Sequence, residues 1–300
     1  MSLLDWWRQR GWQEIDSAAY QEAHAQFGGS VITHPQFIAG VSSLTNIPLR
    51  YFGYFEADKL VAAAPVWHSY IAGSKRILKR TRQYDRVDLG NMEIILPIAP
   101  QSQNVVLRFR GNYLSPLHAN HISSLRKQSE TLSLLKSYND AEFSKKFQYN
   151  RTRELRLLED IGCVVRDIKG FNPADIAKWY VDLFEARWGK KPKAFRTITG
   201  QLAVLKDFLT GNILFINDKP VAIQLVFFAD SPKWTSFEFL NAGVDPEFHK
   251  YSPGGVLTFL NTKLANDYAK AQEKELRYSF GRSDADYKSL WCHQVPVYRI

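Results

Sequence analysis

The sequence predicts a mixed α/β fold built from largely antiparallel sheets that are flanked by helices. Two β-rich runs early in the chain are separated by two turn-forming residues, and three more follow one another soon after residue 210. Amphipathic helical segments lie before and after that second group. Because 300 residues correspond to about two domains of ~150 residues, we expect one domain over 1–138 and another over 139–300.

The first domain contains one predicted hairpin. The runs 50–56 and 59–67 are rich in aromatic and β-branched residues, and Ala57-Asp58 between them favours a turn. Later apolar runs of this domain are interrupted by prolines, which are rare inside central strands, so their pairing stays open.

The second domain opens with a basic amphipathic helix that Asn139 or Asp140 is placed to cap. Its predicted outward face carries the basic residues Lys145, Lys146, Arg151, Arg153 and Arg156. A short strand at 163–168 follows, and Asn172-Pro173 marks the start of another helix, since proline is favoured at the first helical position.

A meander of three antiparallel strands comes next, at 213–216, 221–228 and 234–240, because turn-forming residues separate these runs. The remaining chain predicts a long helix, a strand and a short helix, at 253–272, 276–281 and 284–291.

The start of the long helix is the most informative segment. Ser252 is placed to cap the helix and Pro253 to occupy its first position, yet two glycines follow. Each glycine costs about 1 kcal/mol relative to alanine inside a helix, so the pair indicates that something approaches the backbone closely. Free N–H groups and the positive end of the helix dipole suit a phosphate. The structural alternative is tight packing of the helix on a sheet. We assign to this site Lys250, Tyr251, Ser252, Pro253, Gly254, Gly255 and Val256.

A second group of ionisable residues follows the strand 276–281. The carboxyl ends of strands often carry sites in open α/β sheets. Here Asp284 would accept a proton, Tyr287 would donate one, and Arg282 or Lys288 would hold an anion. The alternative is a helix-capping box surrounded by solvated charges.

Glu238 is a third candidate, because it is a lone acid between Phe237 and Phe239 in a predicted strand. Burial would raise its pKa, which suits a general base. The alternative is that its face of the strand meets solvent.

The formal net charge of +9 favours anionic partners: nucleic acid, acidic lipid or a phosphate-rich cofactor. The first domain carries a basic run that could hold phosphates or could simply be a solvated surface, formed by Lys75, Arg76, Lys79, Arg80, Arg82 and Arg86. No metal site is expected, because His118 and His121 lack a nearby third ligand.

Composition also bears on location. Two cysteines are too few for a disulfide framework, which fits a reducing compartment, and no apolar run approaches the ~18 residues of a membrane span. We therefore expect a cytoplasmic protein. Trp6, Trp7 and Trp12 lie near basic residues and could add peripheral contact with an anionic membrane surface.

The meander, the glycine-bearing segment 251–257 and the closing residues 280–288 together resemble the GNAT-type acyltransferases of the FemAB and CelD-like group. That resemblance covers roughly 139–300. The whole chain also resembles the macrophage-inducible proteins of enteric bacteria that are linked to resistance against cationic antimicrobial peptides.

This resemblance implies tandem GNAT-like halves, the first degenerate, with donor bound by the second half alone. It implies that the donor is an acyl-CoA-like thioester whose pyrophosphate lies at the helix beginning at Pro253, and that the acceptor is an amine or hydroxyl, for instance of the cell envelope. Glu238 or Asp284 would receive the proton, and Tyr287 would protonate the departing thiolate. Three alternatives stay open: an aminoacyl-tRNA donor, an inactive GNAT-fold scaffold at a membrane surface, and a nucleic-acid-binding regulator.

Overall fold

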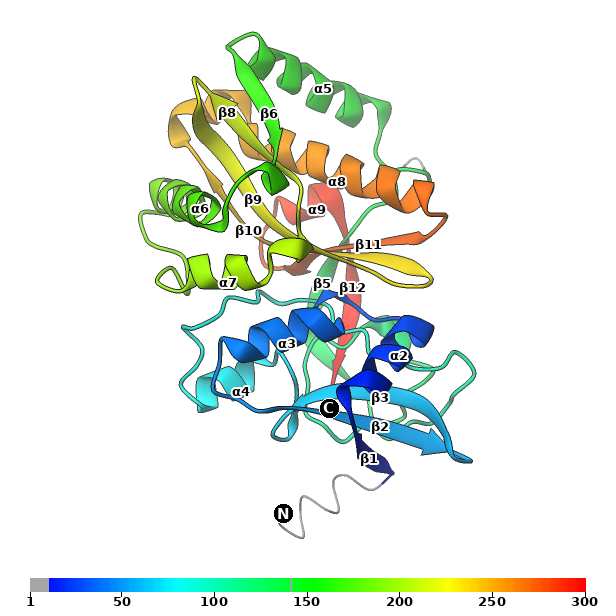
Figure 1. Cartoon of the computed structure of the whole chain (residues 1–300). Coiled ribbons are helices and arrows are strands. Elements are labelled where there is room, and N and C mark those ends of the chain that lie inside the picture. Colours follow the sequence, from blue (N-terminus) through cyan, green and yellow to red (C-terminus); the bar gives the residue numbers. More distant parts are fainter. Residues whose placement is uncertain (1–10, 141) are drawn as a thin grey trace.

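The computed structural model describes residues 11–140 and 142–300, so the predictions made for Trp6 and Trp7 lie outside the described residues. Two halves are stacked one on the other, each built around its own sheet (Figure 1). The architecture is mixed α/β, as the sequence predicts. The expected division at residues 138 and 139 falls between strand β5 and helix α5.

The first half is organised around a four-stranded antiparallel sheet of order β1-β2-β3-β4. Its elements are β1 (Trp12–Ile15), α2 (Ser17–Phe27), η1 (Val31–Thr33), α3 (Pro35–Ser43), β2 (Leu49–Glu56), β3 (Lys59–Trp67), β4 (Tyr70–Ile71), α4 (Lys75–Arg80) and η2 (Pro116–His118). The predicted hairpin is confirmed, because β2 pairs with β3 through Ala57 and Asp58, whose φ angles are 46° and 63°. Such positive φ values at both central residues define the turn that matches strand twist.

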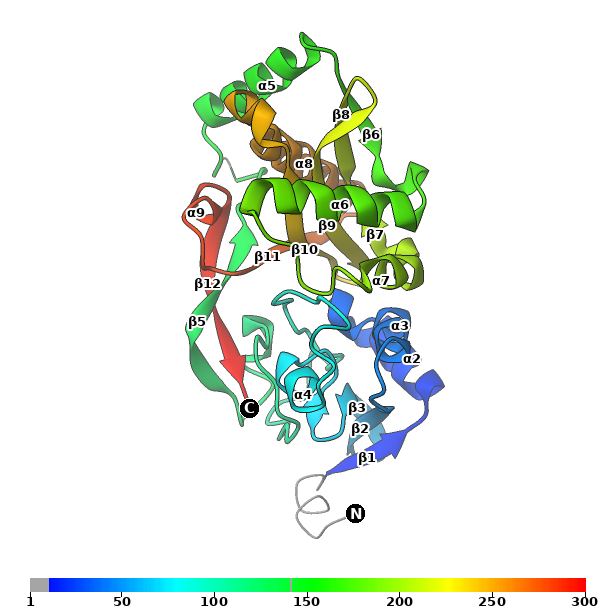
Figure 2. The ribbon, with the colours of Figure 1, turned by 90° about the vertical axis from the view of Figure 1, so that its left-hand side faces the viewer.

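The second half is organised around an eight-stranded sheet of order β12-β5-β11-β10-β9-β8-β6, with β7 paired to β9. Its elements are β5 (Arg126–Leu135), α5 (Lys145–Glu159), β6 (Cys163–Asp167), η3 (Ile168–Gly170), α6 (Pro173–Trp188), α7 (Ile198–Val204), η4 (Lys206–Phe208), β7 (Leu209–Thr210), β8 (Asn212–Ile216), β9 (Lys219–Asp230), β10 (Trp234–Val244), η5 (Pro246–Tyr251), α8 (Pro253–Ala271), β11 (Glu275–Arg282), α9 (Lys288–Trp291) and β12 (Cys292–Arg299). The predicted meander is confirmed as β8, β9 and β10. Helices α5 and α8 cover one face of this sheet, and α6 and α7 lie on the other (Figures 1 and 2).

Strands β5 and β12 connect the two halves. They form a long antiparallel pair that reaches from the upper sheet down beside the first half (Figure 2). There Tyr298 exchanges backbone hydrogen bonds of 3.0 Å with Leu114, which belongs to a loop of the first half. The halves are thus tied by backbone as well as by side chains.

Two local predictions need correction. Helix α5 begins at Lys145, and its N-cap is Ser144, whose hydroxyl accepts a hydrogen bond from the Phe147 N–H, so neither Asn139 nor Asp140 caps it. Ser252 does precede α8, but it adopts a left-handed conformation with φ of 53°, and its side chain makes no capping hydrogen bond. This conformation arises because the chain leaves η5 and enters α8 within one residue.

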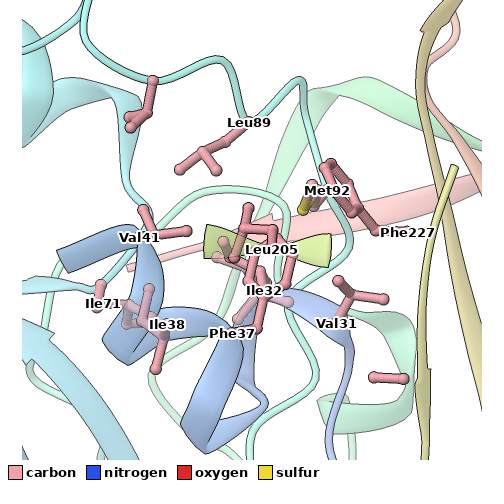
Figure 3. Close-up of a cluster of buried hydrophobic side chains, with 14 of the residues drawn as sticks. Val31, Ile32, Phe37, Ile38, Val41, Ile71, Leu89, Met92, Leu205 and Phe227 are labelled. Carbon is pink, nitrogen blue, oxygen red and sulfur yellow. The ribbon is translucent and has the colours of Figure 1, made fainter. Parts of the chain in front are cut away.

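The seam between the halves is apolar at its centre. Figure 3 shows Val31, Phe37 and Val41 of the first half packed with Leu205 and Phe227 of the second. All five side chains are at most 2% exposed. Burial on this scale, at about 25 cal/mol per Å² of apolar surface, holds the halves in one relative position.

Candidate functional site

The two parallel strands of the large sheet separate part of the way along. Strands β10 and β11 pair in parallel from Trp234–Glu275 to Glu238–Ser279, and no pairing between them continues beyond that point in the described chain. A register shift in β10 between Phe239 and Asn241 accompanies the separation. Bulges of this kind bend a strand away from its neighbour. The sheet therefore opens at Glu238 and Ser279, and each strand leads to one of the predicted clusters.

Strand β10 leads to the start of α8. The first hydrogen bond of that helix runs from the Val256 N–H to the Ser252 carbonyl at 3.0 Å. The N–H groups of Gly254 and Gly255 precede it and lack a partner within the helix, as first-turn amides do. A Cβ atom on Gly254 would lie 3.1 Å from the Val244 side chain. Gly254 and Gly255 are thus closely packed and only partly exposed, and the backbone here carries the positive end of the helix dipole.

Arg151 covers one side of this helix start. A Cβ atom on Gly255 would lie only 2.7 Å from Nη1 of Arg151. The guanidinium pairs with Glu154 at 2.8 Å and lies 5.5 Å from the centre of the Phe147 ring. In the described part of the chain, its buried Nε atom has no hydrogen-bond partner. The predicted outward position of Arg151 is wrong, because α5 directs its guanidinium at the start of α8.

The side chains of the other predicted residues in this segment mainly pack against the rest of the protein. Pro253 is buried, and Val256 is 0% exposed in an apolar cluster against which Tyr251 also packs. Lys250 is exposed, and its ammonium lies 4.9 Å from the centre of the Tyr251 ring. In this segment, the backbone amides and Lys250 are the groups that a ligand could reach.

Strand β11 leads to the second predicted cluster, which the structure brings together. Asp284 accepts hydrogen bonds from Lys288 Nζ at 2.8 Å and from Arg282 Nε at 3.3 Å. Arg282 also donates to Glu130 of β5 at 3.1 Å, and Lys288 donates to the Arg282 carbonyl at 2.6 Å. Burial acts to raise the pKa of Asp284, but Lys288 and Arg282 outweigh it and leave that pKa below its ordinary value. Asp284 is therefore held as a carboxylate.

Tyr287 stands apart from that network. Its side chain is 42% exposed. The part of the ring that is buried raises the pKa of Tyr287 to about 12, so the hydroxyl stays protonated at neutral pH.

Glu238 is buried, so the alternative that its face of the strand meets solvent is wrong. It is 2% exposed and accepts a hydrogen bond of 2.8 Å from the Glu93 N–H across the seam. Glu93 in turn forms a two-pronged ion pair with Arg277 of β11, at 2.5 and 3.1 Å. Burial, and then the Glu93 carboxylate, raise the pKa of Glu238 well above its ordinary value. Glu238 thus has the pKa direction predicted for a base and lies where the strands separate.

An interdomain cavity of about 460 Å³ lies beside the end of β11. Its walls come from α4, the loop around Asn91, β5 and the end of β11, so both halves form it. Arg282 and Asp284 line it. Among the described residues, Glu238, Tyr287 and Lys288 are not part of its lining. The site predicted from sequence is therefore divided between this cavity, the buried acid at the opening of the sheet, and the start of α8.

The chain was compared with known proteins. Curated protein sequences give no match. Among solved structures, FemX is similar over 96% of both chains, with a TM-score of 0.54 and 8% identity. The structure of L-PGS from Bacillus licheniformis covers 96% of this chain and 92% of its own, with 11% identity and a TM-score of 0.48. A tandem GNAT protein from the clavulanic acid pathway covers 96% and 97%, with 9% identity and a TM-score of 0.45.

The likeness to FemX confirms the FemAB-type fold predicted from the sequence, and it concerns the fold alone. Within the described residues, no helix is both long and apolar enough to cross a membrane, and no group of three His, Cys, Asp or Glu side chains could hold a metal ion. A family model described as Mig-14 matches residues 34–300, which is most of the sequence. The chain belongs to the Mig-14 family.

Proposed function

We propose that this protein is a GNAT-type acyltransferase that moves an acyl group from an acyl-CoA-like thioester to an amine or hydroxyl of the cell envelope, in a process linked to resistance against cationic antimicrobial peptides. The observation that supports it most is the separation of β10 and β11 next to a helix whose first turn holds two glycines. By the resemblance to GNAT-type acyltransferases, the acyl chain would lie between these separated strands, and the helix start would give a phosphate its hydrogen-bond donors.

Arg151 strengthens the case for an anion at that helix start. A guanidinium beside the positive end of a helix dipole is unfavourable unless negative charge lies between them. Glu154 supplies one carboxylate, yet Arg151 Nε, a donor, is buried without a hydrogen-bond partner in the described chain. A pyrophosphate at Gly254 and Gly255 would accept hydrogen bonds from the backbone and from Arg151.

In the proposed reaction, a neutral amine or hydroxyl attacks the thioester carbonyl. A C–N or C–O bond forms, the C–S bond breaks, and the proton that leaves the nucleophile is balanced by one that the departing thiolate takes up. Glu238 and Asp284 are the two candidate proton acceptors: Glu238 has the raised pKa, whereas Asp284 faces the cavity. Tyr287 is protonated at neutral pH and can donate.

Calorimetry with acetyl-CoA and longer acyl-CoAs tests the donor site. Gly254→Glu would place a carboxylate where the phosphate binds, so affinity should fall at least about tenfold. Gly200→Glu is the matched control, because Gly200 is exposed in α7 and a Cβ atom there meets nothing within 4 Å. Saturable binding that Gly254→Glu removes and Gly200→Glu keeps would support the proposal. No binding of any thioester to the folded parent protein would overturn it.

Release of thiol from acyl-CoA in the presence of an envelope extract then separates the two candidate bases. Loss of a general base typically lowers the rate by about 10² to 10⁴-fold. We compare Glu238→Gln with Asp284→Asn, because each removes the charge and keeps the shape. A loss of that size in one variant and a small change in the other identifies the base.

A further inference from the structure

The interdomain cavity is strongly and unevenly charged. The basic side chains in its lining outnumber the acidic ones, and they are Lys75, Arg76, Lys79, Lys193 and Arg282. The two acids, Glu130 and Asp284, both pair with Arg282. Among the described residues, the other four basic side chains form no ion pair within 4 Å, although Asp88 acts on Lys75 from farther away. The cavity therefore presents cations that the protein itself leaves without carboxylate partners.

Tyr84 contacts two of these cations. The ammonium of Lys79 lies 4.9 Å from the centre of its ring, and that of Lys193 lies 4.6 Å from it and donates a hydrogen bond to its hydroxyl. Lys79 belongs to α4 of the first half, and Lys193 follows α6 of the second. Both ammonium groups lie beside one ring, and like charges repel each other. An anion near them would relieve that repulsion.

Lys75 adds a third ammonium group to the lining of the cavity. Its ammonium donates to the Asn91 side chain at 2.7 Å. Burial is the main cause that lowers the pKa of Lys75 to about 8; Asp88 opposes this, while the nearby cations Lys193, Arg282 and Lys79 add to it. The basic run found in the sequence is thus not only a solvated surface, because part of it converges on this cavity.

The cavity also lies next to the opening of the sheet. A Cβ atom on Gly90, a lining residue, would lie 3.0 Å from the Leu240 side chain, and Leu240 is in β10 where its register shifts. A volume of about 460 Å³ is in the range of small-molecule sites and suits a head group better than a polymer.

We propose that this cavity binds the acceptor substrate through its phosphate groups, so that the acceptor is a phosphate-bearing molecule. That the ligand is an acceptor rests on the proposed transferase function. That it carries phosphate rests on Lys75, Lys79 and Lys193. Ammonium groups are well suited to phosphate as compact point charges. The same chemistry fits a phospholipid head group and a soluble phosphorylated metabolite.

Calorimetry with inorganic pyrophosphate tests the cavity in the full chain. The double variant Lys79→Gln with Lys193→Gln should weaken binding at least about tenfold, because two charges are lost from one site. The matched control is Lys169→Gln with Lys263→Gln, which removes two charges from exposed positions outside the cavity. Pyrophosphate binding that is unchanged in the cavity variant would overturn the proposal. Binding that Gly254→Glu alone removes would also overturn it, since the anion would then lie at α8.

A vesicle arm distinguishes the two sources. Co-sedimentation with phosphatidylglycerol vesicles, but not with phosphatidylcholine vesicles, that the cavity variant loses would support a lipid acceptor. Pyrophosphate binding without any sedimentation would support a soluble acceptor.

Acyl-CoA titrations separate this inference from the donor site. If the cavity variant no longer binds acyl-CoA and Gly254→Glu still does, the cavity holds the donor and the acceptor assignment fails. If no thioester binds at all while pyrophosphate still depends on the lysines, the phosphate site stands and the transferase function does not.

Discussion

Acid should destabilise this protein through two buried histidines. His118 is 3% exposed, and its Nε2 accepts a hydrogen bond of 2.8 Å from the Leu96 N–H. His24 is 5% exposed, and its Nε2 has no partner in the described chain. Burial is the main cause that lowers the pKa of each to about 3, with neighbouring imidazoles adding to it. Both rings are therefore neutral in the folded protein across the physiological range.

The size of the effect follows from linkage. Both folded-state pKa values lie below the unfolded value of about 6.5, so the stabilising contribution is complete above pH 6.5 and is lost as the pH falls toward 3. At pH 5, each histidine should cost about 2 kcal/mol of unfolding free energy. Glu238 acts in the opposite direction, because its pKa is raised in the folded state and its contribution grows as the pH falls toward the unfolded value. The parent protein alone therefore cannot separate these effects.

Single variants can separate them. Urea unfolding at pH 7.5 and pH 5 gives the loss of stability on acidification for each variant. Gln does not titrate and can still accept a hydrogen bond, so His118→Gln should make that loss about 2 kcal/mol smaller than in the parent. The control is His249→Gln, on the exposed η5 segment, which should leave the loss unchanged. An equal loss in His118→Gln and in the parent would refute the reasoning.

Three further outcomes concern packing and charge. Arg277→Met should lower the unfolding free energy by about 3–5 kcal/mol in urea titrations, because it leaves Glu93 buried and unpaired. Adding Glu93→Gln should recover part of this loss. If the losses of the two single variants simply add in the double variant, the pair does not interact as described. Gly243→Ala should lower the unfolding free energy by about 1–3 kcal/mol in the same assay, because its Cβ atom would lie 2.8 Å from the backbone nitrogen of Phe184. An unchanged unfolding midpoint would show that α6 can shift without loss of stability. Gly254→Glu should change the melting temperature little, because about 0.3–1 kcal/mol of favourable dipole interaction offsets the tight 3.1 Å contact of the new Cβ atom with Val244; a large drop would contradict this.

Local sequence signals were sufficient to predict strands where β-rich runs are separated by turn-forming residues. The hairpin of β2 and β3 and the meander of β8 to β10 have β-rich runs with turn residues between them, and both are confirmed. The N-cap at Asn172 is confirmed too, because its side chain accepts from the Asp175 N–H at 2.9 Å. In each case, the residues that decide the structure lie within a few positions of one another.

Strands β5 and β12 carry weaker local signals, too weak to predict them from the sequence. β5 resembles a polar surface segment, since eight of its ten residues are exposed or only partly buried. β12 contains Pro296, which counts against a central strand, yet β12 lies at the edge of the sheet, where proline is tolerated. Their partners are about 160 residues apart in the chain, so only the assembled fold specifies the pairing.

The candidate site shows the same division between local and long-range information. Arg282, Asp284 and Lys288 are close in sequence and are close in space. Arg151 approaches α8 only because α5 packs across it, and Lys193 joins Lys79 only because the halves meet. A basic residue on a helix face gives no sign in the sequence of which distant backbone it will contact.

The two halves contribute to the proposed reaction in different ways. The proposed donor site consists of α5 and α8 of the second half, whereas the cavity takes Lys79 from the first half and Lys193 from the second. The buried Glu93–Arg277 pair and the apolar cluster of Figure 3 fix the halves relative to each other. Holding two reactants in a fixed geometry supplies much of the acceleration in group transfer. An acceptor anchored by phosphate in a rigid seam would thus be presented to the opening of the sheet, and the first half would act through the wall of the cavity instead of through a donor site of its own.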